Sequence, residues 1–237
     1  MDCLILRFDA PLISFGEVAV DNYNPTGRFP SKSMLTGLLG NALGWDHADA
    51  ALLQDLQSRL RFAARWDAEP EPLTDYQTVD LGQDFLEGTG WTTRGCPEER
   101  KGGSAATETH QRWREYWANG VATVALALDG TGAPSLDELE AALRRPARPL
   151  FLGRKSCLPA APLLMARASA QGVRAALESV PLAEIGPRRR PPRIRAIWPS
   201  DEGGPGNPEQ RFSRRDWLHN IHFGSEACVS GFLGGEP

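Results

Sequence analysis

The segment TGRFPSKSMLTGLLGNALG, residues 26–44, places basic and hydroxyl side chains directly before a run of apolar residues with helical spacing. Four of these side chains could contact a phosphate: Arg28, Ser31, Lys32 and Ser33. The start of a helix carries unpaired N–H groups and a partial positive charge, so this layout suits the capture of a phosphate, including one in a nucleic-acid backbone. The alternative is an ordinary N-cap, in which Ser31 or Ser33 accepts a hydrogen bond from the helix.

The same segment lacks the features of the phosphate loop found in NTPases. That loop needs a glycine directly before its lysine, because backbone N–H groups wrap the phosphate there. Here Ser31 precedes Lys32, and Pro30 has no N–H group to donate. The sequence therefore predicts a general phosphate contact rather than nucleotide hydrolysis.

A second basic cluster lies in PLFLGRKSCLPAAPL, residues 149–163. A short strand is expected at residues 149–153, and Arg154 and Lys155 follow it. In a split βαββαβ domain the last strand lies within the sheet, so this turn could come close to the helix start at Lys32. We expect the two clusters to enlarge one positive patch, with a solvated turn as the alternative.

Two further groups are candidates for RNA contact. Arg193 and Arg195 alternate in RRRPPRIRAIW, so strand geometry puts both guanidinium groups on one face, where they suit phosphates or an acidic protein equally. Tyr76 and Gln77 lie at the mouth of a long irregular segment, and an exposed tyrosine there could stack on a base. Packing of this tyrosine against the base of a hairpin is the alternative.

The sequence contains no assembled catalytic or metal-binding motif. Its four cysteines are isolated, without the spacing of a zinc site, and we expect reduced structural thiols. His219 and His222 lie three residues apart, but two ligands alone do not make a metal site. No Ser/His/Asp set or GxSxG motif is present. We therefore expect no metal, no cofactor and no catalytic residue.

The net charge of −4 is divided unevenly along the 237 residues. Residues 1–143 carry a net charge of −11, whereas residues 144–237 carry +7. A basic C-terminal portion on an acidic body can bind a polyanion on one face and meet a protein on another. No run approaches the roughly 18 apolar residues of a membrane helix, and Asp2 and Asp9 are unlike a signal peptide. We expect a cytoplasmic protein with no membrane partner.

Hydrophobic periodicity and capping residues predict the elements that must position these groups. Helices are expected from Lys32 to the stop at Gly44, over 47–60, and over 135–146, where Ser135 and Glu138 form a capping box. Strands are expected at 3–12, 61–67, 121–129 and 149–153. Between the second and third strands, residues 80–110 are glycine-rich without a helical period, which is typical of a functional loop or an extended hairpin.

This order is close to the βαββαβ pattern of an α+β, ferredoxin-like domain, with an insertion between its central strands. We place that domain at residues 1–163 and the insertion at residues 80–110. Residues 164–237 are expected to form a small, basic, β-rich second lobe, with strands at 192–198, 210–217 and 227–234.

Four motifs in order resemble the CasD family, the RNA-binding RAMP subunits of type I-E CRISPR surveillance complexes (Cascade): LRFDAPLISFGE, GRFPSKSMLTGLLGNALG, TDYQTV and PLFLGRKSCLPAAPL. The resemblance runs from residue 3 to about residue 163 and includes THQRWREYWANGVATVALAL. It implies a ferredoxin-like, RRM-related domain with a protruding β-hairpin thumb, here residues 80–110, and a variable C-terminal part.

The resemblance also implies a function. Family members do not cut RNA in type I-E systems. They hold the 5′ handle of the crRNA, contact the backbone subunit and the large subunit, and use the thumb to kink the guide within a complex that holds target DNA. On this resemblance, Lys32 and Ser33 match the phosphate-facing helix start, and Arg154 and Lys155 match the basic turn.

Two other functions stay open. A related subunit of type I-C systems cleaves the crRNA precursor with tyrosine, lysine and histidine. This chain has Tyr76 and Lys155, but its histidines lie in other contexts, so no such triad is assigned. The other alternative is a scaffold without RNA, in which the basic lobe meets an acidic protein.

Overall fold

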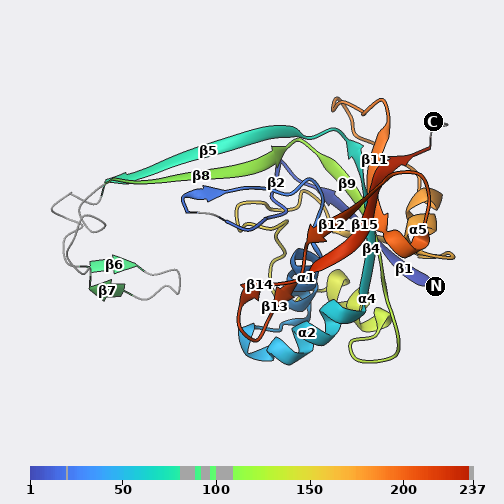
Figure 1. Ribbon diagram of the computed structural model, residues 1–237, viewed down its shortest axis with the longest axis horizontal. Helices are drawn as coiled ribbons and strands as arrows, with labels where there is room; N and C mark the ends of the chain where they lie inside the picture. Colours follow the sequence, from blue (N-terminus) through green and yellow to red (C-terminus); the bar gives the residue numbers. More distant parts are fainter. Residues whose placement is uncertain (20, 81–88, 92–96, 100–108, 235–237) are drawn as a thin grey trace.

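The computed structural model describes residues 1–234 except 20, 81–88, 92–96 and 100–108 (Figure 1). A seven-stranded sheet runs through the body, and every neighbouring pair in it is antiparallel. In spatial order its strands are β10 (Leu164–Ser169), β1 (Asp2–Asp9), β9 (Val121–Leu128), β4 (Leu60–Ala68), β11 (Ile194–Pro199), β15 (Ser225–Leu233) and β12 (Asn207–Phe212).

Helices cover both faces of this sheet. On one face lie α1 (Lys32–Leu43), α2 (Ala50–Arg59) and α4 (Leu136–Arg144), and on the other lies α5 (Val173–Ser179) (Figure 1). Because alternate residues of a strand point to opposite faces, Leu4 and Leu6 pack in the core under α1, whereas Cys3 and Ile5 pack with α5. This burial on both sides accounts for the almost continuously apolar sequences of β1 and β9.

Local capping fixes the ends of α1 where the sequence predicts them. Ser31 accepts a hydrogen bond from Met34 N at 3.1 Å, and Gly44 ends the helix with a left-handed φ of 86°. The predicted capping box of α4 is also present, since the side chains of Ser135 and Glu138 each bond the other's backbone N–H. The expected second helix is shorter, because residues 47–49 form a 3-10 turn and Leu60 starts β4.

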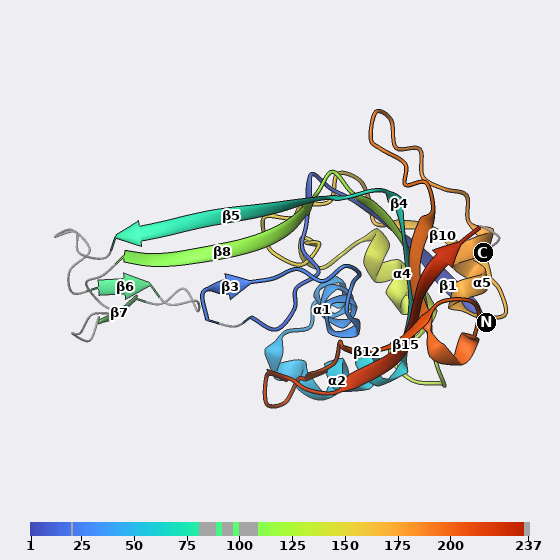
Figure 2. The same ribbon diagram turned by 45° about the horizontal axis from the view of Figure 1, so that its top comes forward.

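A second sheet forms a long projecting hairpin. Its arms are β5 (Glu71–Asp80) and β8 (Thr109–Ala118), and the short strands β2 (Leu12–Ile13) and β3 (Tyr23–Asn24) also pair with β8 (Figure 1 and Figure 2). We call this hairpin, with its arms, the thumb. Most of each arm therefore lies outside the insertion expected at residues 80–110. Within that range β6 (Thr89–Trp91) pairs with β7 (Pro97–Glu99), and residues 81–88, 92–96 and 100–108 lie outside the described part of the chain.

The strand expected at residues 149–153 is wrong. These residues are a loop in which Leu152 N donates to Cys157 O at 2.8 Å and Leu152 O accepts from Ser14 N at 3.0 Å. At its end Gly153 has a φ of 97°, which turns the chain away from strand geometry. The edge position beside β1 is occupied by β10, with the sequence LMARAS, most of whose residues are exposed.

The C-terminal part is rich in strands, but these do not make a separate sheet. Strands β10, β11, β12 and β15 all join the sheet that contains β1, β4 and β9, on both sides of the predicted boundary at residue 163. The remaining strands, β13 (Arg215–Asp216) and β14 (Ile221–His222), form a small hairpin. The predicted strand at 210–217 is therefore split between β12 and β13.

Among the described residues, no helix combines the length and apolar character needed to cross a membrane. The same residues contain no cluster of three or more His, Cys, Asp or Glu side chains suited to a metal ion. Cys3, Cys157 and Cys228 are free and buried, and Cys96 lies outside the described part. Burial, with smaller contributions from nearby acidic groups, raises the pKa of the Cys228 thiol to about 12, so this cysteine is a protonated core side chain.

Candidate nucleic-acid interface

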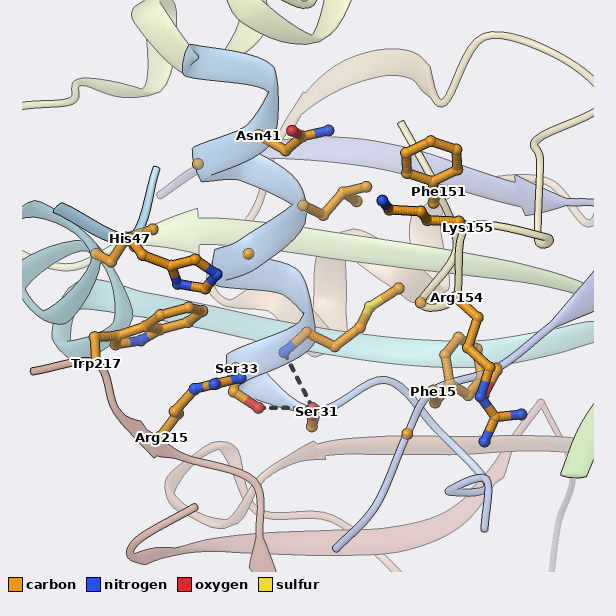
Figure 3. Close-up of a pocket in the computed structure, with 18 of the residues that line it drawn as sticks. Phe15, Ser31, Ser33, Asn41, His47, Phe151, Arg154, Lys155, Arg215 and Trp217 are labelled. Atoms are coloured by element: carbon orange, nitrogen blue, oxygen red, sulfur yellow. Dashed lines mark hydrogen bonds between the residues drawn. The ribbon is translucent and has the colours of Figure 1, made fainter. Parts of the chain in front are cut away.

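A cavity of about 590 Å³ lies between the start of α1, the loop at residues 151–155 and the β13–β14 hairpin (Figure 3). Its volume is in the range of sites for small molecules and nucleotides. Four cations and two carboxylates line it: Arg148, Arg154, Lys155, Arg215, Glu17 and Asp46. The cavity wall is therefore positive overall, and its aromatic members include Phe151 and Trp217.

The helix start and the glycine turn both contribute residues to the wall of this cavity, as the sequence analysis expected. Ser31 and Ser33 line it from α1, and Arg154 and Lys155 line it from the loop. Two of the helix N–H groups on which the expected phosphate capture depends are already bonded, however. Ser33 N donates to Ser213 O at 2.8 Å and Met34 N donates to Ser31 Oγ, so Ser31 is an N-cap and its hydroxyl is already engaged.

Lys32 does not face this cavity. Its Nζ lies 2.6 Å from Glu226 Oε1 of β15, and its side chain is 10% exposed. It lines a second, smaller cavity together with Arg61, Arg211 and Glu226. Ser31, whose backbone is extended, and Ser33 line the large cavity, whereas Lys32 faces β15. Lys32 is thus a partly buried structural cation, in contrast to the expected phosphate ligand.

Arg215 supplies a cation beside the start of α1 that the sequence analysis did not assign. Its side chain extends towards Ser33 across the cavity (Figure 3). Within the described part of the chain, its Nε is buried without a hydrogen-bond partner and its guanidinium has no carboxylate partner. Burial lowers the pKa of this side chain from its ordinary value, yet an arginine stays charged at neutral pH. An uncompensated, partly buried cation favours an anionic ligand.

The hairpin that carries Arg215 is fixed to α2 by polar and apolar contacts. The amide of Gln57 bonds both backbone groups of Arg215, with Nε2 donating to its O at 2.8 Å and Oε1 accepting from its N at 3.1 Å. Trp217 is 9% exposed, packs on Ala50 and Leu53, and lies 5.3 Å below the Arg215 guanidinium as a cation–π partner. The sequence signal for this site is RRDWLHNIH, which combines two arginines, a tryptophan and two histidines.

The two basic residues of the 151–155 loop have different roles. Arg154 donates to Glu115 O at 2.6 Å and Asn24 O at 2.7 Å, and its guanidinium lies 4.7 Å over the ring of Tyr116. It therefore joins the body of the protein to β3 and β8 at the base of the thumb. Lys155 is exposed, has no ion pair within the described residues, and points towards α1 across the cavity (Figure 3).

Two histidines also line the cavity, His47 at the start of the 3-10 turn and His222 on β14. Burial, with a smaller contribution from Arg215, lowers the pKa of His222 from its ordinary 6.5. The imidazole is therefore neutral at pH 7 when no anion is present. A phosphate beside it would favour the protonated form, so occupation of the cavity would be linked to proton uptake.

The other predicted contact residues lie outside the described wall of the cavity. Tyr76 is 52% exposed and lies directly across from Trp113, with ring centroids 5.0 Å apart. Tyr23 stacks on the same tryptophan at 4.8 Å, so three rings cross the thumb sheet in a row. Gln77 bonds the neighbouring Asp75 at 2.6 Å. Tyr76 thus packs on Trp113 midway along the hairpin, while about half of its surface stays exposed.

The two arginines at the start of β11 lie side by side. Arg193, just before the strand, and Arg195 both lie over the ring of Phe232, at 4.0 Å and 5.7 Å from its centroid, and both are exposed. Arg28 is exposed beside α1, and its backbone O accepts a hydrogen bond from Trp66 at 3.0 Å. Ile197 and Trp198 fall on opposite faces of β11, in the two different cores, as the alternation predicts.

Comparison with known proteins gives a consistent result for most of the chain. The family model of the CRISPR-associated protein Cas5 (Cas_Cas5d) matches residues 3–227. The chain is 36% identical over 176 residues to the CRISPR system Cascade subunit CasD of Escherichia coli (strain K12), which covers 73% of this chain and 75% of that relative.

Solved structures agree with the sequence comparison. A chain described as a CRISPR RNA-guided surveillance complex superimposes with a TM-score of 0.71 and 25% identity, covering 97% of this chain and 89% of that one. A second, described as the crystal structure of a Cas protein, gives a TM-score of 0.60 at 22% identity over 98% of this chain and 94% of its own. At 22% identity, the second match shows a likeness of fold alone.

Proposed function

The chain belongs to the Cas5 family of CRISPR-associated proteins, and from that membership we propose that it is a non-catalytic, RNA-binding subunit of a type I-E Cascade that holds the 5′ handle of the crRNA. The relative that is 36% identical is named a Cascade subunit, and the structural match at 25% identity is described as an RNA-guided surveillance complex. Both support membership of a multi-subunit assembly.

The observation that carries the RNA-binding proposal is the charge imbalance of the large cavity. Arg215 and Lys155 face it without carboxylate partners in the described part of the chain, and Phe151 adds a partly exposed ring. Cations bind the phosphates of a single strand, while aromatic rings stack on its unpaired bases. We assign the handle to this cavity, with Ser33 as a neutral contact and Arg154 as the residue that holds the base of the thumb.

The finer features of the proposal follow from the order of elements. Strands β10, β1, β9 and β4 with α1 and α4 have the connectivity of a ferredoxin-like domain, which supports the RRM-related interpretation. In this proposal the projecting thumb contacts the guide, the backbone and large subunits bind other surfaces, and target DNA is held by the whole cytoplasmic complex. Arg28, Tyr76, Gln77, Arg193 and Arg195 are secondary RNA contacts in it.

The RNA that co-purifies with the assembled complex tests this proposal. The tagged chain is co-expressed with the other Cascade subunits and a CRISPR array, and the bound RNA is sequenced from its 5′ ends. We expect short RNAs that share one fixed 5′ end, and crosslinks from that end to this chain. RNA with random 5′ ends, or a complex in which the handle crosslinks only to other subunits, would contradict the proposal and favour the scaffold alternative.

One observation favours testing metal-independent RNA cleavage as a second candidate. Lys155, His47 and His222 line the same cavity, although Tyr76 lies on the thumb and outside the cavity wall. The purified chain is incubated with a repeat hairpin RNA in EDTA from about pH 5 to pH 9, a range that spans histidine titration. We expect the RNA to stay intact, and defined cleavage that His222→Gln abolishes would establish the nuclease instead.

A further inference from the structure

Gln57 is a polar side chain at a buried position of α2, where the other buried residues are apolar. It is 0% exposed, and the helix otherwise buries Ala50, Leu53 and Leu56. A buried amide costs free energy unless its donor and its acceptor both find partners. The partners of Gln57 therefore show what this position contributes beyond filling the core.

The hydrogen bonds of Gln57 go to the β13–β14 hairpin. Its Nε2 donates to Arg215 O at 2.8 Å, and its Oε1 accepts from Arg215 N at 3.1 Å and from Trp217 Nε1 at 3.2 Å. The planar amide carries a donor and an acceptor side by side, so it bonds both backbone groups of a single residue. This contact fixes the backbone of Arg215 relative to α2.

Gln57 is also the main polar link between this hairpin and α2. In the described part of the chain, four hydrogen bonds join residues 215–222 to α2, and three of them involve Gln57. The fourth is donated by Trp217 N to Gln54 Oε1 at 3.3 Å. The seating of the hairpin on α2 therefore depends on Gln57 more than on Gln54.

The guanidinium of Arg215 is supported by its own hairpin. It donates to Asn220 Oδ1 and lies over the Trp217 ring, whereas its Nε has no partner among the described residues. Ser33 N donates to Ser213 O at 2.8 Å, which fixes the chain just before the hairpin. The approach of Arg215 towards Ser33 across the cavity is therefore set by how the hairpin sits on α2 (Figure 3).

We propose that Gln57 is a positioning residue for RNA binding, which holds the backbone of Arg215 so that its guanidinium meets a phosphate of the handle in the large cavity. Because Arg215 pairs with His222 across the hairpin, Gln57 places two residues that line the cavity, while it lies outside the described wall itself. This inference rests on the proposed function, since the ligand is the handle RNA.

The affinity of Gln57→Met for handle RNA, measured by fluorescence anisotropy over a range of salt concentrations, tests this role. Methionine is unbranched like glutamine but cannot bond the Arg215 backbone. We expect at least about fivefold weaker binding. The slope of log affinity against log salt concentration should fall by about one phosphate contact, as in Arg215→Gln. In an Arg215→Gln background, Gln57→Met should have no further effect on affinity, because it acts through Arg215.

Two further variants separate positioning from a loss of stability. Val173→Ala removes buried volume on α5, on the other face of the main sheet, and lowers stability without touching the cavity wall. It should bind RNA as wild type does. Gln57→Asn keeps the amide but is one methylene shorter, so it cannot bond both backbone groups of Arg215 in the same place. It replaces Gln57→Met if that variant does not fold, with the same results expected.

Three results would overturn the proposal. They are unchanged affinity of the folded Gln57→Met protein, an equal loss of affinity with and without Arg215→Gln, and weaker binding at an unchanged salt slope. The last result would leave Gln57 a residue of the fold alone. Failure of the proposed function is distinguishable, because Arg215→Gln itself would then bind handle RNA as tightly as wild type.

Discussion

Lys32 Nζ lies 2.6 Å from Glu226 Oε1, so the cation that begins α1 neutralises a carboxylate of β15 and does not face the large cavity. We expect Lys32→Met to lower the free energy of unfolding by about 1–3 kcal/mol, because Glu226 is left partly buried and unpaired. The folded variant should bind handle RNA within about twofold of wild type. Urea denaturation and fluorescence anisotropy measure the two quantities.

The double variant Lys32→Met/Glu226→Gln is the control for this pair. Removing both charges relieves the unpaired carboxylate, so part of the lost stability should return. If Lys32→Met weakened RNA binding as much as Arg215→Gln while the protein stayed folded, the structural role of Lys32 would be wrong.

Gly153 is required by both its backbone and its surroundings. Its φ is 97°, and a Cβ at this position would lie 1.6 Å from Ser14 O. We expect Gly153→Ala to cost more than about 3 kcal/mol of stability, because the loop must move away from the Ser14 backbone. Gly130→Ala is the matched control, since Gly130 has a φ of 70° but no atom within 4 Å. Equal melting temperatures for the two variants would contradict this steric explanation.

Arg154 should stabilise the fold through its hydrogen bonds to two backbone carbonyls rather than through its charge. Arg154→Lys keeps the charge but cannot reach Glu115 O and Asn24 O together. We expect a loss of about 1.5–3 kcal/mol in unfolding free energy and faster hydrogen exchange in β3 and β8. Weaker RNA binding with unchanged stability and unchanged exchange would instead make Arg154 a direct phosphate ligand.

His222 gives RNA binding a pH dependence with a defined sign. Burial and Arg215 lower its pKa in the free protein, so the unfolded chain binds the proton more readily and stability falls as pH drops below about 6.5. RNA phosphate favours the imidazolium, so RNA affinity should rise between about pH 7.5 and pH 5.5. His222→Gln should reduce this dependence, and an identical pH profile in the variant would exclude a phosphate beside His222.

The sequence predicts features that neighbouring residues determine. Ser31 and Gly44 cap α1 through contacts within a few residues, and the same holds for the capping box of α4, so their boundaries could be predicted. The loop at 149–153 resembled a strand because Leu150 and Leu152 are apolar. Its bonds to Ser14, far away in the chain, decide its conformation instead.

In the candidate site, too, the sequence predicts what neighbouring residues determine and misses what distant contacts determine. The sequence brings hydroxyls and cations to residues 28–33 and 154–155, and the fold places Ser31, Ser33, Arg154 and Lys155 around one cavity. It could not show that Glu226 engages Lys32, or that Arg215 extends towards Ser33, because both depend on where the C-terminal strands lie.

Handle RNA affinity of a cavity double variant tests the central claim most directly. Arg215→Gln/Lys155→Gln is compared with Arg144→Gln/Arg145→Gln, which removes two exposed cations at the end of α4. We predict at least about tenfold weaker binding for the cavity variant. The slope of log affinity against log salt concentration should fall by about two phosphate contacts. The control should bind RNA as wild type does. Equal affinities and equal salt dependence for the two variants would place the RNA elsewhere and contradict the account.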